Sequence, residues 1–243
     1  MKKRKLVWSG LMVLLLFSCE GIDVEPNRRL LISGQIQTAN PSEAEGLRVE
    51  YVTGTTELSQ SVLRRPESFR QETFFEVLGL TSLDGQGRFR MTSLEARGSR
   101  SLGVNLPGTP DYDSDYATLV VSAFPIPLPS TEFTLETTTL ERVRDSRLEV
   151  SRSVFSGDTL EVSIRYASRV KAIYLQDNEF FPSDQMTDFF RLLPGELSES
   201  LEFSTREGSD LEIQFFRING GVQEEGSLTL SPDANQIYRY AMD

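Results

Sequence analysis

Short stretches in which apolar and polar residues alternate follow one another along most of the chain. The stretch Thr159–Tyr166 (TLEVSIRY) shows the pattern clearly, with an apolar residue at every second position. Successive side chains of a β-strand point to opposite faces, so this pattern predicts strands with one buried face. The predicted strands are Leu30–Thr38, Leu47–Thr53, Thr73–Thr81, Arg88–Thr92, Ala117–Phe124, Phe133–Leu140, Leu148–Phe155, Thr159–Tyr166, Ala172–Leu175, Ser200–Ser204, Leu211–Ile218, Ser227–Leu230 and Ile237–Tyr240.

Turn-forming residues separate these strands, and one stretch predicts a helix instead. The turn signals are Asp84-Gly85, Gly157-Asp158, Pro194-Gly195 and Asn219-Gly220-Gly221. Met186, Phe189, Phe190 and Leu193 are spaced i, i+3, i+4 and i+7, and Ser183 stands where an N-cap would. We therefore expect an all-β chain in which one short amphipathic helix serves as a connection.

A charged stretch, Glu141–Asp145, falls between two groups of predicted strands. Residues 30–145 and residues 146–243 are each long enough for one antiparallel β-sandwich, which takes about 100 residues. We therefore predict two tandem β-sandwich domains with their boundary between residues 145 and 146.

The first residues have the pattern of a secretory leader. A basic start, Lys2–Lys5, precedes the apolar run Leu6–Phe17, which is too short for a typical membrane span. The residues Leu16-Phe17-Ser18-Cys19 resemble a bacterial lipobox. The resemblance implies that residues 1–18 are a removed signal peptide and that Cys19 becomes a lipidated (palmitate-bearing) N-terminus. An uncleaved anchor, or an ordinary leader with a chance Cys, is the alternative.

Residues 19–29 follow as an acidic, proline-containing tether that is expected to remain solvated. Glu20, Asp23 and Glu25 resemble the acidic export signal after the Cys of Bacteroidetes-type surface lipoproteins. A charged linker without a sorting role is the alternative. The expected location is the outer membrane, with the cell surface favoured over the periplasmic face and the choice left open.

Composition excludes several classes of function. The chain has 25 Lys and Arg against 36 Asp and Glu, a net charge of −11. Removal of residues 1–18, which hold four cations and no acid, brings the charge to −15. Such an acidic chain is a poor binder of nucleic acid. The chain has no His and one Cys, which excludes Ser-His-Asp and Cys-His catalysis, imidazole or paired-thiolate metal sites, and an intrachain disulfide.

Two motifs bear on the kind of sandwich. The strand Leu31–Thr38 contains Gly34 with the apolar Ile36 two positions later, and Asp84, Gly87, Phe89 and Met91 form a D-x-x-G-x-F-x-apolar hairpin pattern. Both motifs resemble the carboxypeptidase regulatory-like (transthyretin-like) β-sandwich family. That resemblance implies an accessory or docking module without peptidase activity.

The second group of strands contains Phe189–Glu196 (FFRLLPGE). This segment is similar to a turn common in immunoglobulin-like domains. The resemblance implies an immunoglobulin-like sandwich and no particular ligand.

The most distinctive polar segment is Asp111, Tyr112, Asp113, Asp115 and Tyr116. Carboxylates at alternate positions could converge on Ca²⁺, and the two tyrosines could stack on a sugar. The loop lacks the EF-hand glycine and final glutamate, and a solvated acidic loop is the alternative. We assign no other metal, no other cofactor and no catalytic residue.

The sequence therefore predicts a non-catalytic accessory or scaffold protein, held to the outer membrane by the lipid on Cys19 and binding a protein partner in the cell envelope. The alternative is a surface glycan-binding lipoprotein of a nutrient-uptake system. A hydrolase that uses a pair of carboxylates is the third hypothesis.

Overall fold

The computed structural model describes residues 24–53, 76–96, 100–123, 130–152, 158–176, 179–219 and 222–242. Cys19, the predicted site of lipidation, lies outside these ranges. The described elements are β1 (Val24–Gln37), η2 (a 3₁₀ turn, Pro41–Glu43), β2 (Arg48–Thr53), β3 (Glu76–Ser82), β4 (Arg88–Ala96), β5 (Arg100–Val104), β6 (Thr118–Ala123), β7 (Glu132–Thr139), β8 (Val143–Arg152), β9 (Thr159–Gln176), β10 (Glu179–Leu192), β11 (Ser198–Arg206), β12 (Leu211–Asn219), β13 (Val222–Leu230) and β14 (Ile237–Met242). The all-β prediction is confirmed for these residues, none of which forms a helix able to cross a membrane.

The strands form three sheets. One is a three-stranded sheet in the order β4-β1-β7, and another is a three-stranded sheet in the order β11-β8-β14. The third has eight strands, in the order β13-β12-β9-β6-β5-β2-β3, with β10 paired to β9. Three neighbouring pairs are parallel, namely β1 with β7, β6 with β9, and β8 with β14. The expectation of purely antiparallel sandwiches is therefore wrong, because these pairs join strands by long crossovers rather than by hairpins.

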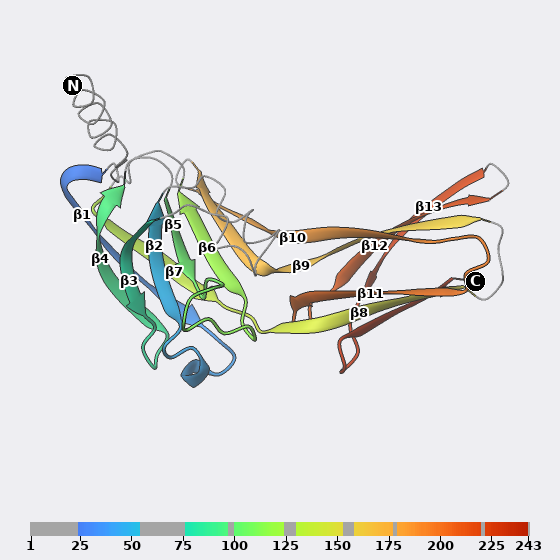
Figure 1. Cartoon of the computed structure of the whole chain (residues 1–243), viewed down its shortest axis with the longest axis horizontal. Coiled ribbons are helices and arrows are strands. Elements are labelled where there is room, and N and C mark those ends of the chain that lie inside the picture. The colour runs from blue at the N-terminus through green and yellow to red at the C-terminus, as the bar shows by residue number, and fades with distance from the viewer. Residues whose placement is uncertain are drawn as a thin grey trace, which may run out of the picture.

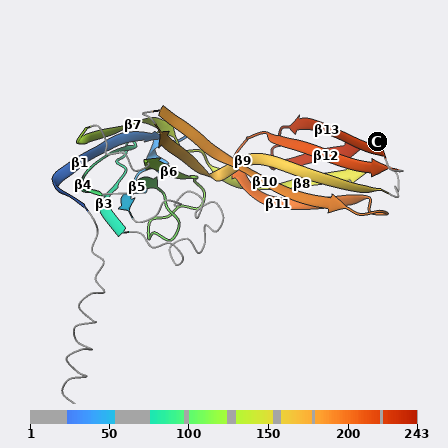
Figure 2. The same cartoon turned by 90° about the horizontal axis from the view of Figure 1, so that it is seen from above.

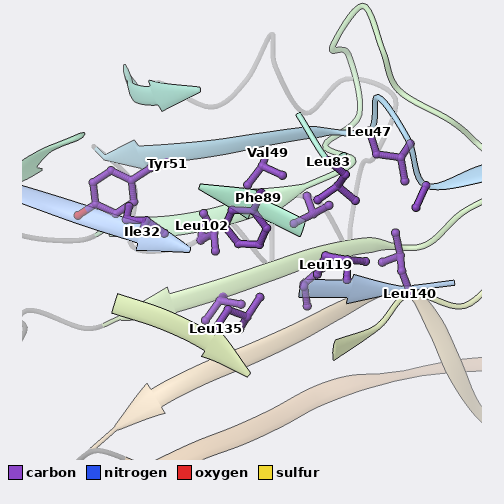
Figure 3. Packing of buried hydrophobic residues seen from close by; sticks show 14 of the residues in the cluster. Ile32, Leu47, Val49, Tyr51, Leu83, Phe89, Leu102, Leu119, Leu135 and Leu140 are labelled. Atoms are coloured by element: carbon purple, nitrogen blue, oxygen red, sulfur yellow. The ribbon is translucent and has the colours of Figure 1, made fainter. Parts of the chain in front are cut away.

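Each small sheet covers one part of the large sheet, so that the molecule has two lobes (Figure 1). In the first lobe, Ile32 on β1 and Leu135 on β7 face Val49 and Leu102 of the large sheet in one buried cluster (Figure 3). In the second lobe, Leu148 on β8 belongs to a separate cluster with strands β9, β12 and β14. Both lobes are therefore two-layer β-sandwiches with their own hydrophobic core.

The strand β9 belongs to both lobes. Its first part, residues 159–166, pairs with β12 in the second lobe. Its last part pairs in parallel with β6 of the first lobe, from Val170 opposite Thr118 to Leu175 opposite Ala123. The strand β10 pairs with β9 along both parts (Figure 2). Residues on both sides of the predicted boundary at 145 and 146 therefore share one sheet.

The segment from Asp84 to Gly87 makes the predicted tight turn, but the turn links two sheets. The Asp84 carboxylate accepts hydrogen bonds from the backbone N–H groups of Gln86 (2.9 Å) and Arg88 (2.8 Å), and Gly87 has φ +69°. The strand β3 before the turn pairs with β2, whereas β4 after it pairs with β1. The hairpin prediction is therefore wrong in its pairing, although Phe89 of the motif is buried.

The predicted helix around Met186–Leu193 is wrong, because these residues lie in β10 and at its end. Met186, Asp188 and Phe190 are half-buried and Leu192 is fully buried, whereas the residues between them are exposed. This period of two buries the apolar side chains against the second core, which a helix could not do while β10 pairs with β9.

Candidate functional site

The loop proposed to bind a ligand is fastened to the fold by Asn105. This residue, at φ 55°, is buried after β5, and its side-chain amide donates to the carbonyl oxygens of Asp113 (2.8 Å) and Tyr116 (3.1 Å). The backbone N–H of Asp113 donates back to the Asn105 side-chain oxygen at 2.8 Å. Asparagine tolerates this left-handed conformation better than most residues. The loop is thus held in place by hydrogen bonds between the Asn105 side chain and the loop backbone.

Tyr116 is placed in the interior and not on the surface. Its side chain is 2% exposed, and its hydroxyl donates a hydrogen bond to Glu43 of η2. Arg142, in the segment between the lobes, forms an ion pair with the same carboxylate. A ring buried in this way has no face to offer a sugar, so the pairing of Tyr112 and Tyr116 as a stacking platform is not formed.

The acidic side chains of the loop do not gather around a point. Asp111 and Asp115 are exposed, Asp113 is half-buried, and the Asp113 carboxylate accepts the backbone N–H of Asp115 at 2.9 Å. The hydroxyl of Tyr112 accepts a hydrogen bond from Arg169 of β9 at 2.8 Å. Within the described ranges, no three acidic side chains are placed to hold a metal ion. Calcium binding here stays a prediction without support from the side-chain placement.

A second set of charged contacts lies where the lobes meet. Glu141 accepts from Lys171 of β9 (3.3 Å) and from Arg206 of β11 (3.5 Å). Arg206 also pairs with Asp184 of β10 at 2.6 Å. With Glu43, Tyr116 and Arg142, these residues make up what we call the junction cluster.

The junction cluster can stabilise an arrangement of strands, but it contains no arrangement suited to chemistry. Its carboxylates form ion pairs with guanidinium or ammonium groups. None of them is therefore placed to transfer a proton or to attack a substrate as a nucleophile. Sequence reasoning named Tyr116 and the stretch containing Glu141, but it missed Glu43, Asp184 and Arg206. Nothing in the local pattern marks those residues, because their partners lie far away along the chain.

The Glu43 carboxylate should make stability depend on pH. The hydrogen bond from Tyr116, followed by that from Arg142, lowers the pKa of Glu43 from its usual value. A lowered pKa gives a contribution to stability that is present above the unfolded-state pKa of about 4.3 and is lost as the pH falls through the folded-state pKa. We expect the wild type to be more stable than Glu43→Gln at pH 7, with the gap closing towards pH 3. Urea unfolding at a series of pH values measures this difference in the free energy of unfolding.

A Tyr116→Phe background serves as the control for this experiment, because it removes the largest cause of the shift. The gap between Glu43 and its Gln replacement should be smaller there at pH 7. A gap that is constant from pH 7 to pH 3 would contradict the assignment.

The turn between β10 and β11 is built differently from the junction cluster. Arg152 of β8, whose side chain is buried, donates to the carbonyl oxygens of Leu193, Glu196 and Asp158. The Glu196 carboxylate in turn accepts the backbone N–H of Leu193 at 2.6 Å. These bonds fix a turn on which Leu193 is 52% exposed and Leu197 is 40% exposed. We call Leu193–Leu197 the distal turn.

Comparison with known proteins gives no family. No family model matches the chain, and no curated protein matches it. The resemblances to carboxypeptidase regulatory-like and immunoglobulin-like domains therefore stay hypotheses.

Solved structures share only a general likeness with the chain. A streptococcal ancillary pilin is 13% identical over 90% of this chain and 64% of its own, with a TM-score of 0.30. The tip fimbrial protein Mfa3 from Porphyromonas gingivalis is 8% identical over 84% of this chain and 81% of its own, with a TM-score of 0.28. A 9R-lipoxygenase from Cyanothece PCC8801 is 15% identical over 56% of this chain and 20% of its own, with a TM-score of 0.26. Scores this low carry no argument about function.

Proposed function

We propose that this chain is a lipid-anchored outer-membrane protein that binds a partner protein of the cell envelope as a non-catalytic scaffold. The observation that carries the proposal is the paired strands β9 and β10, which extend through both lobes with one shift of register between Ser183 and Gln185. A strand of 18 residues extends about 60 Å at the usual rise per residue. An element shared in this way makes the two lobes one extended body.

The two ends of this body lie at different distances from Cys19. The strand β1 begins in the first lobe, five residues after Cys19. Figure 1 shows β10 and β11 meeting at the opposite end, near the C-terminus. A lipid on Cys19 would therefore hold the first lobe at the membrane and present the distal turn away from it.

The distal turn suits a protein partner. Leu193 and Leu197 are exposed, while Arg152 keeps their backbone in one conformation. A contact surface that is already ordered loses less conformational entropy on binding. Apolar side chains at such a place can provide the buried centre of an interface.

The experiment introduces a photo-reactive phenylalanine analogue at Leu193 or Leu197 in the full chain and cross-links intact cells. We expect the same protein adduct from both positions and none from Thr92, an exposed position on β4 of the first lobe. Different adducts at the two positions, or the same adduct at Thr92, would overturn the proposal.

The anchor is tested separately with Cys19→Ser, which should leave the membrane fraction. Retention of that variant there would disprove the lipid on Cys19.

A further inference from the structure

The outer face of the sheet β10-β9-β12-β13 in the second lobe has an ordered pattern of side chains. The strand registers place Phe189 opposite Ser163, Ser163 opposite Gln214, and Gln214 opposite Ser227. These four residues cross the sheet as one line of uncharged side chains, which we call the neutral row. Phe189, Gln214 and Ser227 are exposed, and Ser163 is half-buried.

The lines of residues on either side are charged, and their charges are largely paired. On one side, Arg165 pairs with Glu212 at 3.6 Å. On the other side, Arg191 pairs with Glu161 at 2.9 Å, and that line also holds Phe216 and the acid Glu225. These lines together hold two cations and three acids, a net charge of −1. A strongly charged ligand would find little net attraction there.

Phe189 is 75% exposed, the highest value among the large apolar side chains that the structure describes as exposed. Its ring lies on the outer side of β10, while its neighbours Asp188 and Phe190 turn inward. Phe216 lies on the same face, two strands and one line away, at about 12 Å from the usual strand spacing and rise. The face therefore combines the exposed ring of Phe189 and the half-buried Phe216 with hydroxyl and amide groups, and the paired Glu161 also lies between the two rings.

We infer that the neutral row binds a neutral polysaccharide laid across the strands. The ring of Phe189 would stack on the apolar C–H face of one sugar, since an aromatic face is electron-rich and carries no charge. Ser163, Gln214 and Ser227 would exchange hydrogen bonds with the hydroxyl groups of the sugars that follow. This site differs from the loop Asp111–Tyr116 and does not depend on the proposed protein partner.

The test is native-gel affinity electrophoresis of the chain without its leader, which migrates well because it is acidic. Separate gels contain mixed-linkage β-glucan, xyloglucan, galactomannan or amylopectin, and a fifth contains the anionic polygalacturonate. We expect retardation in at least one neutral gel and none in polygalacturonate. Phe189→Ala should weaken the association about tenfold or more, as expected for an exposed aromatic anchor. Phe189→Tyr should keep it, because the ring is retained.

Leu94→Ala is the matched control, since Leu94 is also exposed (44%) but lies in the first lobe. It should leave the retardation unchanged. Phe189 is so exposed that its replacement should not alter the thermal unfolding temperature, which checks that the variant is folded. The inference is overturned if no neutral polysaccharide retards the protein, if polygalacturonate retards it more, or if Phe189→Ala binds as the wild type does. If Phe189→Ala instead removes a protein cross-link while all five gels stay negative, the face is a protein-docking surface.

Discussion

A fragment of residues 24–142 should fail to fold, although it contains every strand before the predicted boundary. In the full chain β9 is the hydrogen-bonded neighbour of β6 in the large sheet, and Val120, Val170 and Ala172 are completely buried along this pairing. The fragment lacks Val170 and Ala172, so it loses their apolar contacts and exposes Val120. Burial of each valine contributes about 1.5–3 kcal/mol, and burial of the alanine methyl contributes about 0.8 kcal/mol. The total is a large part of the 5–15 kcal/mol that stabilises a typical domain. Circular dichroism during urea unfolding should show no cooperative transition.

The matched fragment carries residues 167–184 attached through a flexible Gly-Ser linker, which supplies the missing parts of β9 and β10. This fragment should regain a cooperative transition. The full chain should unfold in one transition, because the lobes share β9. If residues 24–142 alone unfold as cooperatively as the fragment with the added hairpin, the first lobe does not need β9.

Gly87→Ala should be among the most destabilising single substitutions in the first lobe. Gly87 has φ +69°, and a Cβ atom there would lie 2.0 Å from the backbone oxygen of Ile36. The same place holds a hydrogen bond from the Ile36 N–H to the Gly87 carbonyl at 2.8 Å, which a displaced strand would weaken. The left-handed strain and the clash together should lower the free energy of unfolding by about 3–4 kcal/mol. Urea unfolding measures this loss.

Gly46→Ala separates the effect of left-handed backbone strain from the effect of the clash with Ile36. Gly46 has φ +88°, but nothing lies within 4 Å of its Cβ position. This variant should therefore lose only the strain, about 1–2 kcal/mol. Equal losses at Gly46 and Gly87 would show that the contact with Ile36 does not matter.

Most strands could be predicted because one of their faces is buried and the other is solvated. In Thr159–Tyr166, for example, Leu160 and Ile164 are buried, whereas Glu161 and Arg165 are exposed. The strand β5 was not predicted, because all five of its residues are buried and the segment begins with a charged residue. Arg100 is held there by Glu95, which is also buried. Alternation cannot reveal a strand that is covered on both faces.

The mistaken helix in β10 has a similar cause. Asp188 occupies an inward position, where an apolar residue would have completed the alternation with Met186 and Phe190. It is tolerated because the Tyr166 hydroxyl donates to its carboxylate at 2.6 Å. That partner comes from the neighbouring strand β9, which sequence spacing does not reveal. The apolar residues left over then matched a helical period by chance.

The candidate sites depended even more on distant pairing. The local pattern of Asp111–Tyr116 was distinctive, but Asn105, Glu43 and Arg169 decide how its side chains are used. The neutral row could not be predicted at all. Its members come from four strands, and only the registers of β10, β9, β12 and β13 align them.

The sharing of β9 also sets the order in which the protein can mature. The ribosome makes residues 24–142 before it makes Val170–Leu175, the segment that pairs with the edge of β6. Until that segment has been synthesised, the first lobe has an open edge at β6 and an incomplete core. The first lobe can close only after β8 and the first part of β9, which belong to the second lobe, have also emerged.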